Sequence, residues 1–178
     1  MRKKILYVDM DGVLADFDKR ILEINPSIVT LSSHAPNYEE RSEMVKQVMI
    51  ANPRLFLDLE PIEGSIEAVK RLWPHFDVLF LSTPCPFVVE SFSDKMTWIY
   101  EHFGEAAENR LILSQRKELN LGDFLVDDRL ANGADRFLGQ HLHFAHDERF
   151  PTWVEVEEYL MKYKDYDWSN TLDANYTK

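Results

Sequence analysis

The sequence predicts an α/β protein built on a Rossmann-like parallel sheet. Short apolar runs bounded by turn residues recur along the chain, which is the pattern of buried strands. Segments with apolar residues every three or four positions separate these runs, as helices do in repeated strand–helix–strand units. Several runs end directly in acidic or hydroxyl residues, as strands do where an open α/β sheet binds its ligand. The expected strands are residues 5–8, 78–81, 111–113, 124–126 and 142–144.

Helices are expected between these strands. Residues 86–103 carry apolar side chains at helical spacing, and we expect them to form the buried face of a helix. Residues 62–73 predict a second helix, which Pro74 is placed to stop. Further helices are predicted from about residue 14 to Asn25-Pro26, over 130–137 and over 153–163. The predicted apolar face of the 86–103 helix consists of Val88, Val89, Phe92, Met96, Ile99, Tyr100 and Phe103.

Residues 25–60 interrupt this alternation. A polar stretch precedes one helical segment, predicted over residues 38–50, and Asn52-Pro53 breaks that segment. About thirty-five residues is long for an ordinary connection, so we interpret this part as a small helical cap inserted after the first strand–helix unit. The predicted core is then residues 1–24 and 61–163, and residues 164–178 form a polar tail.

Composition limits the possible functions. The chain has 178 residues, which favours a single domain, and its 45% apolar and 29% charged residues are typical of globular proteins. A net charge of −11 argues against binding nucleic acid polymers, which need clustered lysine and arginine. The only cysteine is Cys85, which excludes an intrachain disulfide. Without an apolar run long enough for a signal peptide or a membrane span, we expect no membrane partner and a cytoplasmic location.

Asp9 and Asp11 follow the first predicted strand, and Gly12 comes directly after them. If the strand geometry continued, both carboxylates would point the same way, and a cation would relieve their repulsion. Taken alone, the same pattern also fits a solvated Asp-Gly turn.

Two other strand ends carry polar side chains. The strand 78–81 ends in Ser82-Thr83, whose hydroxyl groups fit a phosphate contact, a turn or a helix cap equally well. The strand 124–126 ends in Asp127-Asp128, and adjacent carboxylates at a strand end need solvent or a cation.

These motifs resemble the signatures of the haloacid dehalogenase superfamily, in the order of that superfamily. The resemblance implies that Asp9 is the nucleophile and that Asp11 is the general acid and base, in contact with the phosphate. It assigns phosphate binding to Ser82, with Thr83 as the runner-up. The third signature falls on Gln115-Arg116-Lys117-Glu118 and favours Lys117, with Arg116 as the alternative. It further implies that Mg²⁺ binds to Asp9, Asp11 and Asp128, with Asp127 orienting a water or a neighbouring side chain.

Within the superfamily, the chain is most similar to the 5'(3')-deoxyribonucleotidases. The similarity rests on residues 9–17, on Leu59-Glu60-Pro61 with Gly64 and 67–69, and on 127–134. It implies a phosphomonoesterase acting on nucleoside monophosphates through an aspartyl-phosphate, and it admits a homodimer. In that family the counterpart of Phe17 lines the nucleoside pocket, although a place in the core suits Phe17 equally well.

The cap departs from this family. Family members of known specificity carry an aromatic pair and a further tryptophan there, whereas residues 25–60 contain no tryptophan. Phe17, Tyr38 and Phe56 remain as possible platforms for a base. The alternatives are therefore a superfamily phosphatase acting on a non-nucleotide ester or a non-catalytic module that binds a phosphorylated ligand. Asp11 argues against a dehalogenase, which needs no second acid.

Overall fold

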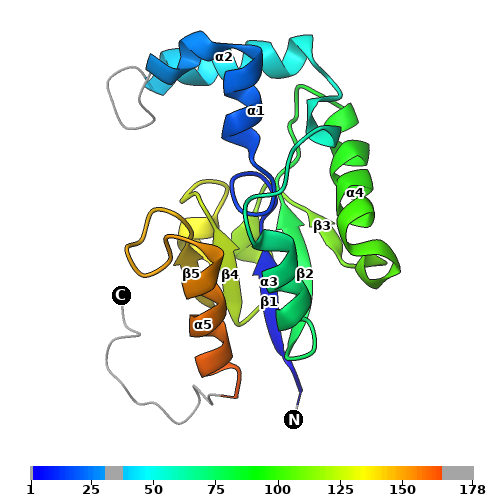
Figure 1. Ribbon diagram of the computed structural model, residues 1–178, viewed down its shortest axis with the longest axis vertical. Helices are drawn as coiled ribbons and strands as arrows, with labels where there is room; N and C mark the ends of the chain where they lie inside the picture. The colour runs from blue at the N-terminus through cyan, green and yellow to red at the C-terminus, as the bar shows by residue number, and fades with distance from the viewer. Residues whose placement is uncertain (1, 31–37, 166–178) are drawn as a thin grey trace.

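A computed structural model describes residues 2–30 and 38–165 of the chain. Its centre is a five-stranded sheet in the order β3-β2-β1-β4-β5, with every neighbouring pair parallel (Figure 1). The predicted α/β class and parallel sheet are confirmed. The strands are β1 (Lys4–Val8), β2 (Phe76–Ser82), β3 (Leu111–Leu113), β4 (Phe124–Asp127) and β5 (Gln140–His143).

One face of the sheet is covered by the helices α3 (Ser65–Leu72), α4 (Glu90–Phe103) and α5 (Trp153–Tyr163). Val8, Phe80, Trp98 and Trp153 belong to the large core beneath these helices. A smaller cluster around Tyr7 and Leu125 lies on the other face. The strands are therefore buried on both sides, as parallel strands require.

The segment between β1 and α3 is helical. It contains α1 (Phe17–Ile24), the 3₁₀ turns η1 (Pro26–Thr30) and η2 (Leu55–Leu57), and α2 (Tyr38–Ala51) between those turns. Asp16 caps α1, because its side chain accepts a hydrogen bond from the backbone of Lys19 at 3.0 Å. Figure 1 shows α1 and α2 beyond the carboxyl ends of the strands, so that α1 stands beside α2 rather than on a face of the sheet.

Two element predictions are corrected by the structure. The helix expected over 130–137 is wrong, because Asn132 and Gly133 have left-handed φ values of 54° and 84°. Only the 3₁₀ turn η5 (Ala134–Arg136) forms there. Besides η1 and η2, the described residues also form the 3₁₀ turns η3 (Gly104–Ala107) and η4 (Lys117–Leu119). The last strand, expected at 142–144, begins two residues earlier.

The predicted buried face of α4 is wrong in part. Phe92, Met96 and Tyr100 are exposed, whereas Asp94 and Lys95 are completely buried. The helix therefore turns two charged side chains inward, and a rule based on apolar spacing places them outside. Of the other predicted members of that face, Val88, Ile99 and Phe103 are buried, and Val89 is exposed.

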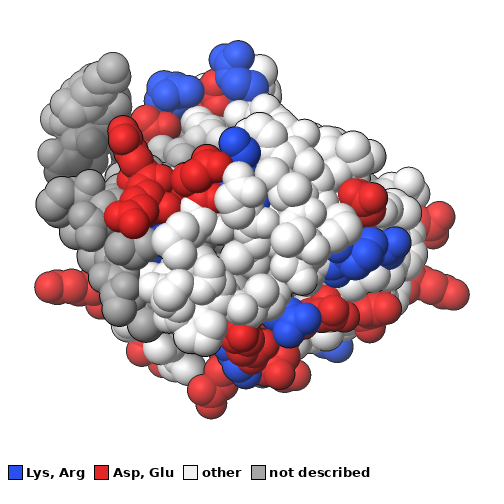
Figure 2. Space-filling view, turned by 90° about the horizontal axis from the view of Figure 1, so that it is seen from above, with Lys and Arg blue, Asp and Glu red and all other residues white. Residues whose placement is uncertain are grey.

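Within the described part of the chain, no helix is long and apolar enough to cross a membrane. Seen from above in Figure 2, acidic and basic side chains surround a broad area that carries neither.

Candidate active site

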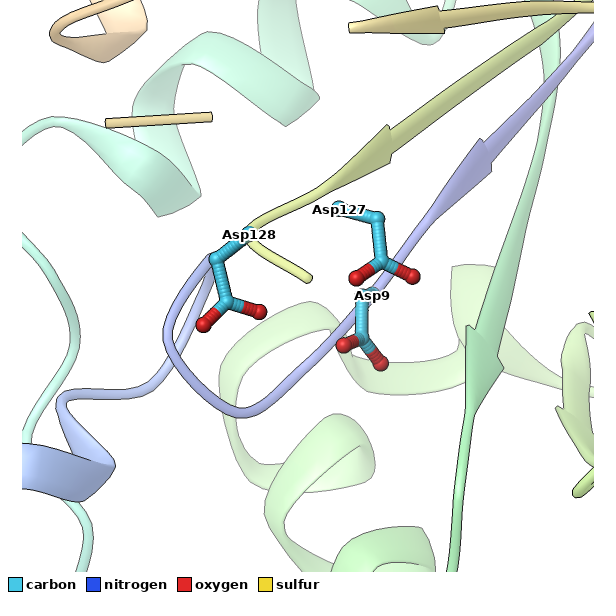
Figure 3. A group of neighbouring side chains, drawn as sticks. All are labelled: Asp9, Asp127 and Asp128. Atoms are coloured by element: carbon cyan, nitrogen blue, oxygen red, sulfur yellow. The ribbon is translucent and has the colours of Figure 1, made fainter. Parts of the chain in front are cut away.

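Three acidic residues meet where β1 and β4 end. Asp9 follows β1 directly, Asp127 is the last residue of β4, and Asp128 comes next. The backbone N–H of Asp9 donates to the carbonyl of Val126 at 2.9 Å, which holds the two strand ends together. One carboxylate oxygen from each of the three acids lies within 4.8 Å of the other two (Figure 3). Neighbouring parallel strands thus bring residues from distant parts of the sequence into one cluster.

The loop after β1 passes closely beside this cluster. It turns back on itself, since the N–H groups of Leu14 and Ala15 both donate to the carbonyl of Met10. Gly12 has a left-handed φ of 77°, and a Cβ atom placed there would lie 2.4 Å from Oδ2 of Asp128. A glycine is needed for both reasons: the backbone conformation and the position of the Asp128 carboxylate.

The surroundings of the cluster disfavour the ionised form of its carboxylates. Burial raises the pKa of Asp128 to about 8, and the charges of Asp9 and Asp127 add to that effect. Burial and the charge of Asp9 also raise the pKa of Asp127, to about 7. Among the described residues, Oδ1 of Asp9 and Oδ1 of Asp128 are buried without any hydrogen-bond partner. Oxygen atoms in this condition fit a hard divalent cation, for which carboxylates are the preferred ligands.

Asp127 differs from the other two acids because both of its carboxylate oxygens have partners. Oδ1 accepts a hydrogen bond from the backbone of Arg129 at 2.9 Å, and Oδ2 accepts one from Nζ of Lys117. Asp127 therefore holds the Lys117 ammonium group and the backbone of Arg129, and its role in orienting a water or a neighbouring side chain stays a prediction.

Lys117 reaches the cluster from η4. Its Nζ lies 3.0 Å from Oδ2 of Asp9, and its side chain is 3% exposed. Burial lowers the pKa of Lys117, but the charges of Asp9 and Asp127 together outweigh burial, so the pKa is raised and the ammonium stays charged. The alternative, Arg116, has a side chain that is 64% exposed and pairs with Glu118. The geometry therefore favours Lys117 for the third signature.

The two hydroxyl candidates after β2 have different surroundings. Ser82 is buried, and its Oγ lies 3.2 Å from Nζ of Lys95. Thr83 donates its hydroxyl hydrogen to the carbonyl of Ser114 at 3.0 Å, which ties the two loops together. Ser82 is thus next to charged groups of the site, whereas Thr83 holds its loop in place.

The carboxylate of Asp11 is not part of the acidic cluster formed by Asp9, Asp127 and Asp128. Its Oδ2 instead lies 2.5 Å from Nζ of Lys95, a completely buried residue of α4. Burial raises the pKa of Asp11, and the charge of Lys95 opposes that shift. Asp9 and Asp11 therefore have different environments, although they are only two residues apart.

Lys95 was not predicted from the sequence. The one available signal was its position: Lys95 stands three and four residues before Trp98 and Ile99, both of which are fully buried. A lysine in that register is at the core side of the helix, but the spacing alone does not say that it meets Asp11 and Ser82.

The aromatic candidates Phe17 and Phe56 contact each other and differ in how deeply they are buried. Phe17 and Phe56 stack with their ring centres 5.9 Å apart and an angle of 19° between the planes. Phe56 is 2% exposed and packs in the core, so it offers no open face for a base. Phe17 is only partly buried. The side chain of Tyr38 lies outside the described residues.

Comparison with known proteins identifies the family. The profile described as 5' nucleotidase, deoxy (pyrimidine), cytosolic type C matches residues 3–166. The chain belongs to the 5'(3')-deoxyribonucleotidase family. A putative 5'(3')-deoxyribonucleotidase of Vibrio phage KVP40 is 40% identical over 158 residues, covering 89% of this chain and 85% of the relative. The human cytosolic type is 30% identical over 165 residues, covering 84% and 76%.

Solved structures agree on the fold of this deoxyribonucleotidase-family chain. A hydrolase from Streptococcus pneumoniae superposes with a TM-score of 0.51 at 13% identity, covering 90% of this chain and 100% of the other. A haloacid dehalogenase-like hydrolase from Xanthomonas campestris gives 0.53 at 12% identity, covering 90% and 96%. These structures confirm the predicted fold. The family that the profile and the relatives identify is one of phosphoric monoester hydrolases.

Proposed function

We propose that the protein is a Mg²⁺-dependent phosphomonoesterase that hydrolyses nucleoside monophosphates in the manner of a 5'(3')-deoxyribonucleotidase. The observation that carries the proposal is the separation of the two acids after β1. Asp9 belongs to the acidic cluster and contacts Lys117, whereas Asp11 pairs with Lys95. Phosphoryl transfer through a carboxylate needs two acids with such different roles, a nucleophile and a proton donor.

In the first half of the proposed reaction, a carboxylate oxygen of Asp9 bonds to phosphorus while the ester P–O bond breaks. Asp11 gives its proton to the departing alcohol oxygen, for which its raised pKa is suited. In the second half, Asp11 takes a proton from a water molecule whose oxygen bonds to phosphorus. The bond to Asp9 then breaks, which releases inorganic phosphate and restores both carboxyl groups.

The remaining residues of the site supply charge and hydrogen bonds. Asp9, Asp128 and the main-chain carbonyl of Asp11 would hold Mg²⁺, which supplies positive charge that shields the phosphate from the anionic nucleophile. Ser82 and Lys117 would bind phosphate oxygens. The unpartnered oxygens of Asp9 and Asp128 support this metal assignment.

The nucleotide part of the proposal rests on the names of the relatives. Residues 25–60 would act as the cap over a core of residues 1–24 and 61–163, with 164–178 as a tail, and the position of α1 and α2 beyond the strand ends supports a cap. A cytoplasmic location is supported by the single cysteine and by the human relative's name, and cell fractionation tests it.

The decisive experiment measures phosphate release from a panel of nucleoside monophosphates and sugar phosphates, with Mg²⁺ and with EDTA. We expect Mg²⁺-dependent release, highest for deoxyribonucleotides, and its loss in Asp9→Asn while the circular dichroism spectrum is unchanged. Turnover by Asp9→Asn close to that of the wild type would refute the nucleophile. Preference for a sugar phosphate would favour the non-nucleotide alternative, and binding without release would favour the non-catalytic module.

We also propose that the protein forms a homodimer through α4. Phe92, Met96 and Tyr100 form an exposed, uncharged row four residues apart. The exposed Phe87 and Val89 come just before α4, and Nζ of Lys46 lies 4.7 Å from the centre of the Phe87 ring. At about 150–250 Å² for a large side chain, this row exposes on the order of 500 Å², over half of the ~800 Å² that each partner of a standard interface buries. A two-fold axis would place the same row of a second copy against it.

Sedimentation equilibrium tests the dimer. We expect the wild type to sediment as a dimer and Met96→Glu as a monomer. The control is Leu138→Glu, a change at a residue that is also exposed but lies between η5 and β5. A monomeric wild type, or a dimer that Met96→Glu leaves intact, would refute this interface.

A further inference from the structure

Helix α4 contacts residues 54–59, which lead from the end of α2 back to the sheet and which we call the return segment. Nη2 of Arg54 lies 3.0 Å from Oδ1 of Asp94, and the indole N–H of Trp98 donates to the carbonyl of Leu59 at 2.7 Å. Between these two contacts, Nζ of Lys95 lies 4.8 Å from the centre of the Phe56 ring. One side of α4 therefore makes a polar contact, a cation–π contact and a hydrogen bond to residues 54–59.

Burying the carboxylate of Asp94 in this contact carries a free-energy cost. Its side chain is completely buried, and among the described residues its Oδ2 has no hydrogen-bond partner. Burial raises its pKa, and the charge of Arg54 is the strongest effect in the opposite direction. Because the Arg54 side chain is 59% exposed, its ion pair with the buried Asp94 contributes little to stability, and an apolar residue of similar volume at position 94 would remove the cost of burying a charge. A role outside stability explains its presence better.

That role follows from the next residue along the helix. Lys95 extends its ammonium group to Oδ2 of Asp11 at 2.5 Å and to Oγ of Ser82 at 3.2 Å. Because Asp94 and Lys95 are adjacent on one rigid helix, a shift that exposes Asp94 to water also withdraws Lys95 from the site. An unpaired carboxylate at position 94 favours such a shift, since it is buried at a high free-energy cost.

We propose that the Arg54–Asp94 ion pair is a positioning device that holds Lys95 against Asp11 and Ser82. Through it, the return segment 54–59 sets the placement of the proton-donating acid and of a phosphate-binding hydroxyl. The inference rests on the proposed phosphatase function. Among the described residues, Arg54 and Asp94 bond to each other and not to Asp11 or Ser82, so the proposed effect of the pair passes through Lys95.

The test compares steady-state kinetics of Arg54→Ala, Asp94→Asn and Lys95→Met, singly and in pairs, with deoxynucleotides and p-nitrophenyl phosphate. Arg71→Ala is the matched control, because the Arg71 side chain is also 59% exposed and pairs with Glu157, which connects α3 to α5. We expect Arg54→Ala to lower kcat about 10–100-fold, as for a misplacement on the order of 1 Å, with little change in KM. Arg71→Ala should leave kcat near the wild-type value, and Arg54→Lys should restore most of it.

The double variants show whether the pair acts through Lys95. In the Lys95→Met background, Arg54→Ala and Asp94→Asn should cause no further loss of kcat. Asp94→Leu adds a second measurement: its melting temperature should equal or exceed that of the wild type, while its kcat falls. This combination separates positioning from a structural role.

Three outcomes would overturn the inference. Losses that multiply in the Lys95→Met background would show independent roles, and an effect of Arg54→Ala no larger than that of Arg71→Ala would show no role. If Asp9→Asn abolishes turnover and Lys95→Met does not affect it, the proposed function stands and this inference fails. If Asp9→Asn is itself active, the proposed function fails.

Discussion

Nζ of Lys117 lies 3.0 Å from Oδ2 of Asp9 and also bonds to Asp127, so one lysine pairs with carboxylates at the ends of two neighbouring strands. Such a group is ready to stabilise the charge that develops on phosphate oxygens during transfer. Lys117→Ala should therefore lower kcat by about 10²–10³, the usual loss for one transition-state donor. Rates of phosphate release at saturating substrate measure this effect.

The adjacent residue provides the control for Lys117. Arg116 points outward to Glu118, so Arg116→Ala should change kcat by less than about threefold, as expected for a surface ion pair. A larger loss for Arg116→Ala than for Lys117→Ala would move the third signature to Arg116.

The acidic cluster predicts how stability depends on pH without metal. The pKa of Asp128 is raised to about 8 in the folded protein from an ordinary value of 3.8, so folding favours its protonated form. That stabilisation is complete below pH 4 and is lost as the pH rises toward 8. In EDTA, the melting temperature should therefore fall as the pH rises from about 4 to about 8, most steeply below pH 7, where Asp127, with a pKa of about 7, contributes in the same direction.

Mg²⁺ should reverse this trend, because it binds the ionised carboxylates of the folded state and stabilises that state by mass action. Thermal melts in EDTA and in Mg²⁺ across this pH range give both slopes. Asp128→Asn should flatten the slope in EDTA and remove most of the stabilisation by Mg²⁺. An equal gain from Mg²⁺ in the variant and the wild type would place the cation elsewhere.

Much of the fold was predictable from the sequence because parallel strands are continuous apolar runs. The runs at 5–8 and 111–113 became β1 and β3 with at most one added residue. The helix at 130–137 failed because Asn132-Gly133 interrupts it: both residues adopt the left-handed conformation, and Asn-Gly is a turn signal that the apolar spacing of this segment does not reflect. Local spacing does not contain that information.

The site was predictable to a similar degree, for a related reason. Asp9, Asp127 and Asp128 stand at strand ends, which a parallel sheet brings to one edge whatever the details of packing. Lys95 comes from the middle of a helix, and its contact with Asp11 depends on how α4 is rotated about its axis. The inward-facing Asp94 and Lys95 show that α4 is rotated away from the orientation that apolar spacing predicts, although Ile99 and Phe103 stay buried.

The structure is compatible with two roles for Phe17. It could form a wall of the nucleoside pocket, or it could serve only as a residue packed on Phe56. For a pocket wall, Phe17→Ala should raise KM for a deoxynucleotide about tenfold, by analogy with the ~1–3 kcal/mol that one stacked base contributes. KM for p-nitrophenyl phosphate, which has no nucleoside, should then stay within twofold to threefold of the wild type. Equal changes for both substrates would assign Phe17 to packing alone.

Gly12 gives a prediction with a matched control elsewhere in the chain. Both Gly12 and Gly64 have left-handed φ values, 77° and 75°, but a Cβ on Gly64 would meet only Cβ of Trp153, in ordinary van der Waals contact at 4.0 Å. Gly64→Ala should therefore cost only the backbone strain, on the order of 1–2 kcal/mol of unfolding free energy. Gly12→Ala should carry the same strain and also displace the Asp128 carboxylate, 2.4 Å from the new methyl group. It should lose both stability and apparent Mg²⁺ affinity, measured by urea unfolding and by the Mg²⁺ dependence of phosphate release. If the two variants show the same Mg²⁺ dependence, Asp128 either does not bind the cation or moves away from the methyl group without leaving it.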